Sequence, residues 1–204
     1  MILYYSPGAC SLAPHILLEE TGVRHELVEV NVQQGKTQEP EFLKLNPKAR
    51  VPVLVTGTEV LTEVPAICWY IGSTAGRFIP ADVLLQARML EWFNWLSGTL
   101  HAVAFGGKWR PQRFVTQADM FRDVQAMADR NLRDGFAHVE QWLADKPWAI
   151  GAEYTLVDPY VFVFHNWARS IGVDVRSDYP RWHAHSARML ARPAVQRALQ
   201  REGF

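Results

Sequence analysis

The chain has 204 residues, 49% of them apolar and 21% charged, which is enough apolar material to bury one large core or two smaller ones. Because 21 basic residues balance 21 acidic ones, the formal net charge is zero, and we expect no general affinity for nucleic acid or for anionic membranes. No run reaches the ~20 apolar residues of a membrane-spanning helix, no basic leader opens the chain, and two cysteines cannot build a disulfide scaffold, so we expect a cytoplasmic globular protein.

The first 79 residues alternate short strand patterns with helical patterns. The glycine at Gly22 is placed to end the first helix, and Thr56-Gly57-Thr58 joins two apolar runs as a hairpin. In chain order the patterns predict a strand at 2–5, a helix at 11–21, a strand at 25–32, a helix at 39–45, strands at 51–55 and 59–61, and a helix at 64–74. A crossover followed by a hairpin implies a mixed sheet with helices packed on it.

The chain changes character near residue 80. Residues 80–85 predict a linker, and only helical patterns follow it. These patterns predict helices at 86–105 and 116–145, a helix opened by the capping box Thr155-Leu156-Val157-Asp158, and helices at 180–191 and 194–201. The predicted organisation is therefore an α/β domain at 1–79, a linker at 80–85 and an all-helical domain at 86–204.

Cys10 lies at or next to the start of the predicted helix 11–21. The partial positive charge and free N–H groups of a helix N-terminus favour a thiolate, and a thiol pKa lowered by about two units, roughly 2.7 kcal/mol, makes the anion dominant at pH 7. The alternative is that Cys10 is a small buried packing residue, which is our interpretation of Cys68. Ala13 stands where a second redox cysteine would be needed, so Cys10 has no local resolving partner.

Two further segments favour binding of an extended peptide. Pro52 lies where a strand is predicted to begin, so its missing N–H removes no ladder bond, and a cis peptide there presents the free backbone groups of Val51. Glu63 and Val64 place an acid and free amides at a helix start, which suits the ammonium and carboxylate of an amino acid.

These segments resemble the glutathione transferase family, most closely its bacterial beta class. The motifs are Tyr-Tyr-Ser-Pro-Gly-Ala-Cys-Ser at 4–11, Asn-Pro-Lys-Ala-Arg-Val-Pro-Val-Leu at 46–54 and Leu-Thr-Glu at 61–63, and further matches at 91–94, at 155–160 and at 191–195 extend the resemblance over essentially the whole chain. The resemblance implies a thioredoxin-like N-terminal domain with a mixed four-stranded sheet, an α-helical bundle as the C-terminal domain, and a homodimer.

The resemblance also implies glutathione as co-substrate and assigns the residues around it. Cys10 faces the glutathione sulfur with His101 beside it, and the Ser11 hydroxyl is a second candidate for stabilising a thiolate. Asn94 reaches the glutathione of the partner subunit. The implied glutathione-binding residues are Cys10, Lys36, Val51, Pro52, Glu63, Val64, Asn94, Gly98, Thr99 and His101. By spacing, Asn94, Gly98, His101 and Phe105 share one helix face, and we expect Phe105 and Trp109 to line the pocket for an apolar second substrate.

Two departures from the family pattern affect glutathione binding. Val64-Pro65 follows Glu63 where the family usually has serine or glycine, so a hydroxyl contact of about 1 kcal/mol is lost. Lys36, assigned to the glycine end of glutathione, fits that place only with a small register slip. No metal site is expected, because His165, His183 and His185 have no acidic or cysteine ligands clustered with them in the sequence.

Three functions follow as hypotheses. The first is conjugation of the glutathione thiolate to small hydrophobic electrophiles. The second is a glutathione-dependent thiol–disulfide reductase or dehalogenase that uses Cys10 as a covalent nucleophile. The third is a non-catalytic glutathione-binding interaction protein. The identity of the electrophile does not follow from the sequence.

Overall fold

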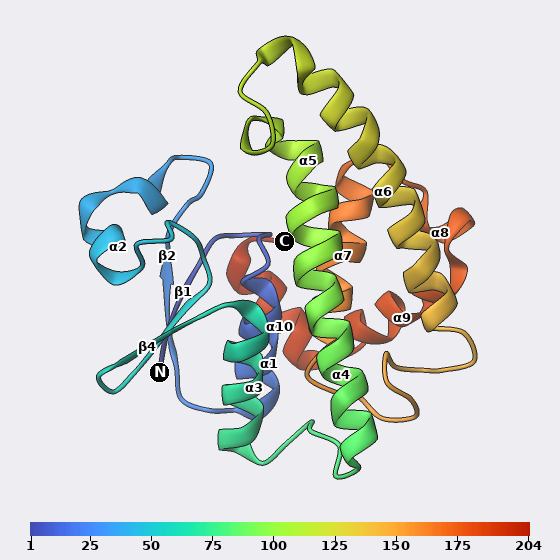
Figure 1. Cartoon of the computed structure of the whole chain (residues 1–204). Coiled ribbons are helices and arrows are strands. Elements are labelled where there is room, and N and C mark those ends of the chain that lie inside the picture. The colour runs from blue at the N-terminus through green and yellow to red at the C-terminus, as the bar shows by residue number, and fades with distance from the viewer.

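The computed structural model describes all residues, 1–204 (Figure 1). The N-terminal part forms one four-stranded sheet in the order β2-β1-β3-β4. β1 (Ile2–Tyr5) pairs in parallel with β2 (Glu26–Glu29) and antiparallel with β3 (Val53–Thr56), which forms a hairpin with β4 (Glu59–Thr62). The predicted mixed four-stranded sheet is confirmed.

Helices α1 (Leu12–Thr21) and α3 (Val64–Ala75) pack against each other beside the sheet, and the short α2 (Pro40–Leu45) lies apart from them (Figure 1). Gly22 ends α1 in the left-handed conformation, at a φ of 70°, as its position predicts. The β2 strand is shorter than the predicted 25–32, because β1, its one partner in the sheet, extends only from Ile2 to Tyr5.

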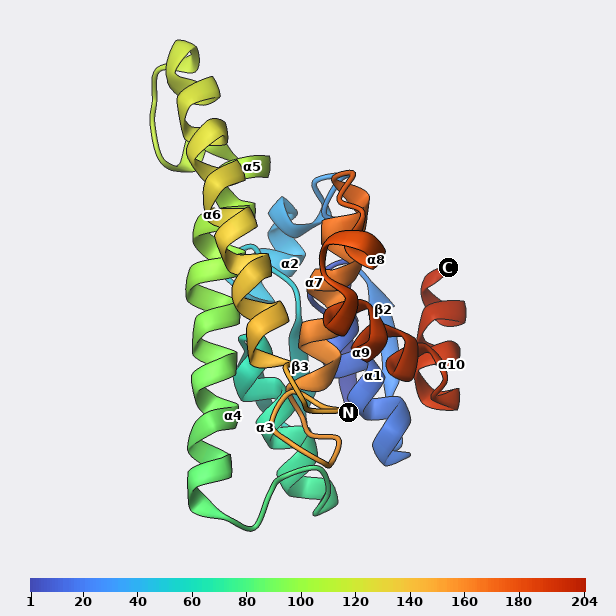
Figure 2. The ribbon, with the colours of Figure 1, turned by 90° about the vertical axis from the view of Figure 1, so that its right-hand side faces the viewer.

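The rest of the chain is helical. Its α-helices are α4 (Val83–Trp95), α5 (Gly106–Trp109), α6 (Phe121–Trp142), α7 (Asp158–Ser170), α8 (Val175–Asp178), α9 (Pro180–Leu190) and α10 (Pro193–Glu202). Short 3-10 turns at Lys36–Gln38, Pro111–Arg113 and Ala118–Met120 complete the fold. Helix α4 and the helical residues that follow it, up to α5, lie alongside α6 (Figure 2). Helix α10 lies next to α1. No helix combines the length and the apolar character that a membrane crossing requires.

Two details of the helical part differ from the predictions. Helix α4 begins at Val83, inside the predicted linker 80–85, because the Asp82 carboxylate accepts a hydrogen bond from the Leu85 N–H at 2.9 Å and caps the helix there. The predicted helix 86–105 changes type: from Leu96 to Phe105 it is a π-helix. A π-helix has more residues per turn than an α-helix, so residues three apart, such as Gly98 and His101, no longer share a face.

A single hydrophobic core joins the two parts of the chain. It contains Leu3 and Leu54 of the sheet, Ile16 of α1, and Phe93 and Phe162 of the helical part, each at most 1% exposed. A second, smaller cluster of Val30, Phe42, Val51 and Val53 packs under α2. Because the main core is continuous, the sheet and the helices hold the walls of the space between them in a fixed relation.

Candidate functional site

The loop between β1 and α1 is held by residues from the far end of the chain. The Gly8 N–H donates to the Glu202 carboxylate at 3.0 Å, and the Trp167 indole N–H donates to the Gly8 carbonyl at 2.8 Å. Gly8 has a φ of +69°, and a Cβ there would lie 3.1 Å from the ring of Phe204. The positive φ favours glycine at this position, and the two hydrogen bonds hold the loop that carries Cys10 two residues later.

Cys10 is a protonated thiol, which corrects the prediction of a thiolate. It precedes the first residue of α1, Leu12, by two positions, and its side chain is buried, 7% exposed. Burial raises the pKa of the Cys10 thiol to about 12, and this outweighs the opposing effects of backbone N–H groups and of the charge on Arg110. The Sγ atom donates to the Val51 carbonyl at 3.6 Å. The positive end of the helix is therefore too weak to ionise a desolvated sulfur.

The segment before β3 presents free backbone to the same space. The Val51–Pro52 peptide bond is cis, as the family resemblance implies. The Val51 N–H has no partner within the protein, and its carbonyl accepts only from Cys10. The Asn46 side chain shapes this turn by donating to the Arg50 carbonyl at 2.7 Å. An extended peptide therefore has one donor and one acceptor available at Val51.

Glu63 lies at the start of α3, where the sequence places it. Its backbone φ is +72°, unusual for a residue with a side chain, and its carboxylate pairs with the Lys48 ammonium at 2.6 Å. Val64 is the first helical residue, and no side chain caps the helix. The free N–H groups of this first turn can bind a carboxylate, and Glu63 can bind an ammonium.

His101 faces these groups from the π-helix. Its Nδ1 atom lies 3.3 Å from the Tyr160 hydroxyl, and its ring lies 4.9 Å from that of Trp167. Burial, followed by the nearby charges of Arg110 and Arg50, lowers the pKa of His101 to about 4. The ring is therefore neutral at pH 7, a donor or acceptor of hydrogen bonds rather than a cation.

A cleft of about 1430 Å³ brings these groups together between the sheet and the helices. The structure places seven of the predicted site residues on its walls: Cys10, Val51, Pro52, Glu63, Val64, His101 and Trp109. The two that lie farthest apart in the sequence, Cys10 and Trp109, are separated by 99 positions. The cleft can hold an extended peptide along one wall and an apolar molecule along the other.

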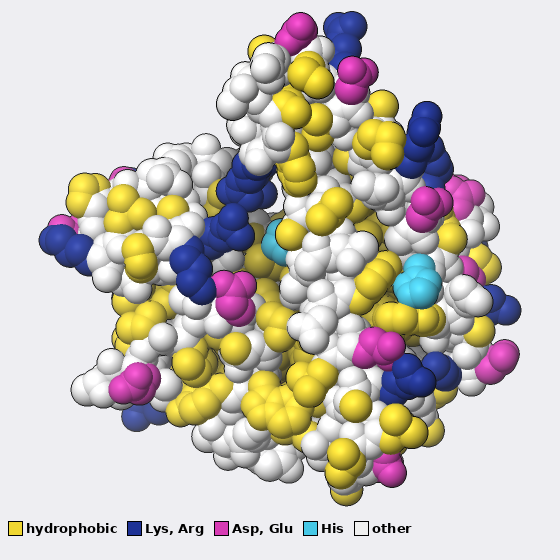
Figure 3. Space-filling model, in the orientation of Figure 1, with side chains coloured by type: hydrophobic (Ala, Val, Ile, Leu, Met, Phe, Trp, Pro, Cys, Tyr) yellow, Lys and Arg dark blue, Asp and Glu magenta, His cyan; other side chains and the backbone are white.

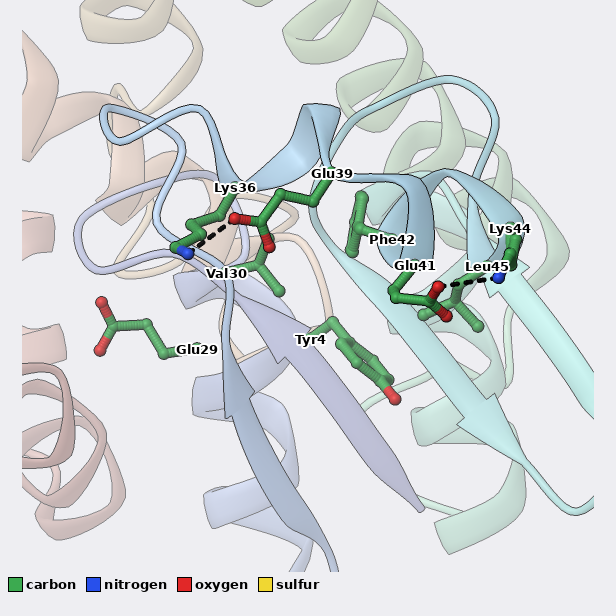
Figure 4. Close-up of a pocket in the computed structure, with 9 residues that line it drawn as sticks. All are labelled: Tyr4, Glu29, Val30, Lys36, Glu39, Glu41, Phe42, Lys44 and Leu45. Atoms are coloured by element: carbon green, nitrogen blue, oxygen red, sulfur yellow. Dashed lines mark hydrogen bonds and ion pairs between the residues drawn. The ribbon is translucent and has the colours of Figure 1, made fainter.

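Ser11 and Lys36 are two of the predicted site residues that lie away from the cleft. The Ser11 hydroxyl is fully buried and bonds to the backbone of Ser6, accepting from its N–H at 3.1 Å, so it does not face the space beside Cys10. Lys36 points into a separate pocket, where its ammonium pairs with Glu39 at 2.7 Å (Figure 4). Gly35 turns the chain with a φ of 74°, and it is Gly35 that lines the cleft instead.

The predicted face of Asn94, Gly98, His101 and Phe105 is also corrected. Asn94, Gly98 and Thr99 are exposed and lie outside the cleft of their own chain, so a contact of Asn94 with the glutathione of a partner subunit stays a prediction. Phe105 is fully buried, and its ring packs 4.7 Å from that of Trp109. It supports the cleft from beneath, because its ring packs against Phe164 and Trp167 in the core and not toward the open space.

Sequence reasoning missed a group of basic and polar residues in the cleft. Lys48, Arg50, Arg110, Arg113, Asn166, Trp167 and Arg169 all line it. Lys and Arg side chains form a row across the hollow of the molecule, beside a histidine (Figure 3). Four arginines at intervals of up to 60 residues form no visible cluster in the sequence, and only the fold brings them together.

Comparisons with known proteins agree with this geometry. The N-terminal domain of the glutathione S-transferases matches residues 1–73 and their C-terminal domain matches residues 113–193. A relative named glutathione S-transferase GstA from Escherichia coli is 32% identical over the full length of both chains. A glutathione transferase homolog from Sulfitobacter with bound glutathione is 31% identical, covers 100% of this chain and 98% of its own, and superposes with a TM-score of 0.92. A bacterial beta class glutathione S-transferase from Sphingomonas chungbukensis is 34% identical, covers 100% of this chain and 99% of its own, with a TM-score of 0.85.

Proposed function

This chain belongs to the glutathione S-transferase family of enzymes, and we propose that it joins the sulfur of glutathione to small electrophiles, with Cys10 acting as a hydrogen-bond donor and not as a nucleophile. The observation that carries this choice is the burial and protonation of Cys10 beside a free peptide-binding edge. The thiolate, not the thiol, is the nucleophilic form of cysteine. Because burial raises the pKa of the Cys10 thiol to about 12, Cys10 is protonated at pH 7.

Glutathione is held mainly by the wall of the cleft that the N-terminal part provides. The free N–H and the carbonyl of Val51 pair with the central residue of the tripeptide. The Glu63 carboxylate and the Val64 amide meet the amino-acid end, and Lys48 adds a cation for a carboxylate next to Glu63. The relatives with bound glutathione support this substrate.

Conjugation needs an ionised glutathione sulfur held close to an electrophile. The Cys10 S–H group and the neutral His101 ring lie in front of the peptide-binding edge, and each can donate a hydrogen bond to a nearby anion. The thiol proton leaves to solvent, and the sulfur electron pair forms the new bond to carbon. Proximity supplies the rest of the rate enhancement.

The role of Cys10 separates this proposal from the reductase or dehalogenase alternative. We expect Cys10→Ala to keep conjugation of 1-chloro-2,4-dinitrobenzene within about tenfold of the unchanged protein, because one neutral hydrogen bond is lost. Cys68→Ala is the matched control, because Cys68 is equally a free cysteine, is fully buried and lies outside the cleft. Loss of all activity in Cys10→Ala, together with disulfide reduction by the unchanged protein, would reverse the assignment. Glutathione binding without turnover of any electrophile would favour the interaction protein.

We also propose that the chain forms a homodimer through the exposed side of α4 and the π-helix. Val83 and Leu90, seven positions apart on one face of α4, are 77% and 44% exposed, and Asn94 lies exposed one turn after Leu90. Val103 of the π-helix is 46% exposed. Apolar side chains gathered on one face of a domain favour an interface between protein chains. Sedimentation equilibrium tests this proposal: we expect twice the 23.3 kDa of one chain, and a single-chain mass at micromolar concentration would refute it.

A further inference from the structure

The cleft carries a strong positive charge in a protein whose formal net charge is zero. Five basic side chains line it, and Glu63 is its one acidic side chain. Glu63 is already paired with Lys48, whereas Arg50, Arg110, Arg113 and Arg169 form no ion pair. The basic row in Figure 3 crosses the mouth of this hollow. A surplus of unpaired cations in a cleft attracts anionic ligands.

Three of these arginines converge from both sides of the cleft. Arg50 precedes the cis peptide of the N-terminal part, while Arg110 precedes the 3-10 turn that follows α5 and Arg113 is the last residue of that turn. These arginines repel one another. Burial and the charges of Arg110 and Arg50 lower the pKa of Arg113, and the same three causes lower the pKa of His101. A bound anion would offset this repulsion, because each guanidinium offers a planar pair of donors that matches a carboxylate or sulfonate.

An aromatic surface lies next to the two arginines of the helical part. Trp109 immediately precedes Arg110, and Phe114 immediately follows Arg113; both line the cleft and are 40% and 46% exposed. The Trp109 ring is held from behind by Trp167, at 5.1 Å between ring centres. Flat apolar ligands stack on such rings. Aromatic and cationic groups therefore alternate within a short stretch of the cleft wall.

We propose that the second substrate of this cleft is an aromatic electrophile that carries an anionic group, a carboxylate or a sulfonate, which Arg110 and Arg113 bind. This inference rests on the proposed conjugation reaction and names the substrate class of the same site. For an aryl chloride, the electron pair of the glutathione thiolate forms the C–S bond, and chloride leaves with the electrons of the broken C–Cl bond. The charged group takes no part in bond formation; it orients the ring.

The position of these arginines separates the second substrate from glutathione. The groups matched to the tripeptide, at Val51, Glu63 and Val64, belong to the N-terminal part. Arg110 and Arg113 belong to the helical part and adjoin the aromatic surface. They are therefore placed to bind the molecule that lies on Trp109.

The first measurement compares two probes that differ in charge. The unchanged protein is given 4-chloro-3,5-dinitrobenzoate or the neutral 4-chloro-3,5-dinitrobenzamide at saturating glutathione, and each kcat/KM is divided by the uncatalysed rate. We expect the benzoate to be preferred by about tenfold, the effect of one charge-assisted contact, and the preference to shrink in high salt. Equal corrected values for the two probes overturn the inference and leave the proposed conjugation intact.

A second measurement does not depend on turnover. Calorimetry with glutathione present compares binding of the unreactive 3,5-dinitrobenzoate and 3,5-dinitrobenzamide. If neither aryl chloride is conjugated, the proposed function is refuted. The difference in binding affinity between these two unreactive compounds still tests the substrate class. We expect the benzoate to bind about tenfold more tightly, and the preference to fall toward one in Arg113→Gln. Arg176→Gln, an exposed arginine outside the cleft, is the matched control and keeps the preference. If Arg113→Gln raises only the KM for glutathione and keeps the benzoate preference, the arginine serves the tripeptide and the inference is wrong.

Discussion

The two walls of the cleft are built in different ways. The N-terminal wall presents backbone groups at Val51 and Val64, fixed by turns that span a few residues. The helical wall presents the side chains of His101, Trp109 and Trp167, which are held in place by packing across the core. Local chain geometry therefore fixes the peptide-binding wall, whereas tertiary packing fixes the wall for the second substrate.

The largest expected effect comes from breaking the support of the helical wall. The buried carboxylate of Asp158 accepts from the Thr155 N–H at 2.7 Å and from the Ala149 N–H at 2.8 Å, and it pairs with His185 at 2.8 Å. We expect Asp158→Ala to lower the free energy of unfolding by about 4 kcal/mol, because several buried polar groups lose their partner. Urea unfolding measures this loss.

Asp119→Ala provides the control for that experiment, because Asp119 is exposed. Its effect on the free energy of unfolding is expected within about 0.5 kcal/mol. A loss below about 1 kcal/mol in Asp158→Ala would mean that the capping residues do not anchor α7, and that Trp167 is positioned by other contacts.

An intermediate effect is expected from acid. The pKa values of His101 and His165 are lowered to about 4, below the value of about 6.5 in an unfolded chain. Between pH 6.5 and 4 the unfolded chain binds protons that the folded chain does not, so the free energy of unfolding falls as the pH falls. In the unchanged protein, the free energy of unfolding falls between pH 7 and pH 4.5. We expect this fall to be about 2 kcal/mol smaller in His101→Gln.

The free energy of unfolding is measured at pH 7 and at pH 4.5 for both the unchanged protein and His101→Gln, so that each protein is compared with itself at pH 7. Parallel losses in the unchanged protein and in His101→Gln would show that His101 titrates normally and is open to water. The helical wall would then be less closed than the packing of His101 against Trp167 indicates.

The smallest expected effect tests which lysine of the N-terminal part belongs to the glutathione site. Lys36 pairs with Glu39 on the surface, outside the cleft, so Lys36→Ala should leave the KM for glutathione within about twofold and stability within about 0.5 kcal/mol. Lys48→Ala, which removes a cation from the cleft, should raise the KM about fivefold. Steady-state kinetics with varied glutathione measures both, and a tenfold rise in Lys36→Ala would restore that lysine to the glutathione site.

The order of strands and helices, the mixed sheet and the placement of Glu63 at a helix start could be predicted from the sequence. The cis bond at Pro52 was implied only by the family resemblance. Hydrophobic periodicity, proline and glycine act over a few residues, so a linear reading can recognise their effects. The family resemblance rested on the same local motifs and is confirmed.

Only the tertiary structure decided the chemical state of Cys10 and the composition of the helical wall. The pKa of Cys10 depends on how completely the surrounding chain excludes water. Phe105 is buried because its ring packs against Phe164 and Trp167 of a helix that lies about 60 positions later in the chain. Arg50 and Arg113 lie 63 positions apart and meet only because the core closes around them. Burial and long-range charge are properties of the folded whole, and no short segment of the chain encodes them alone.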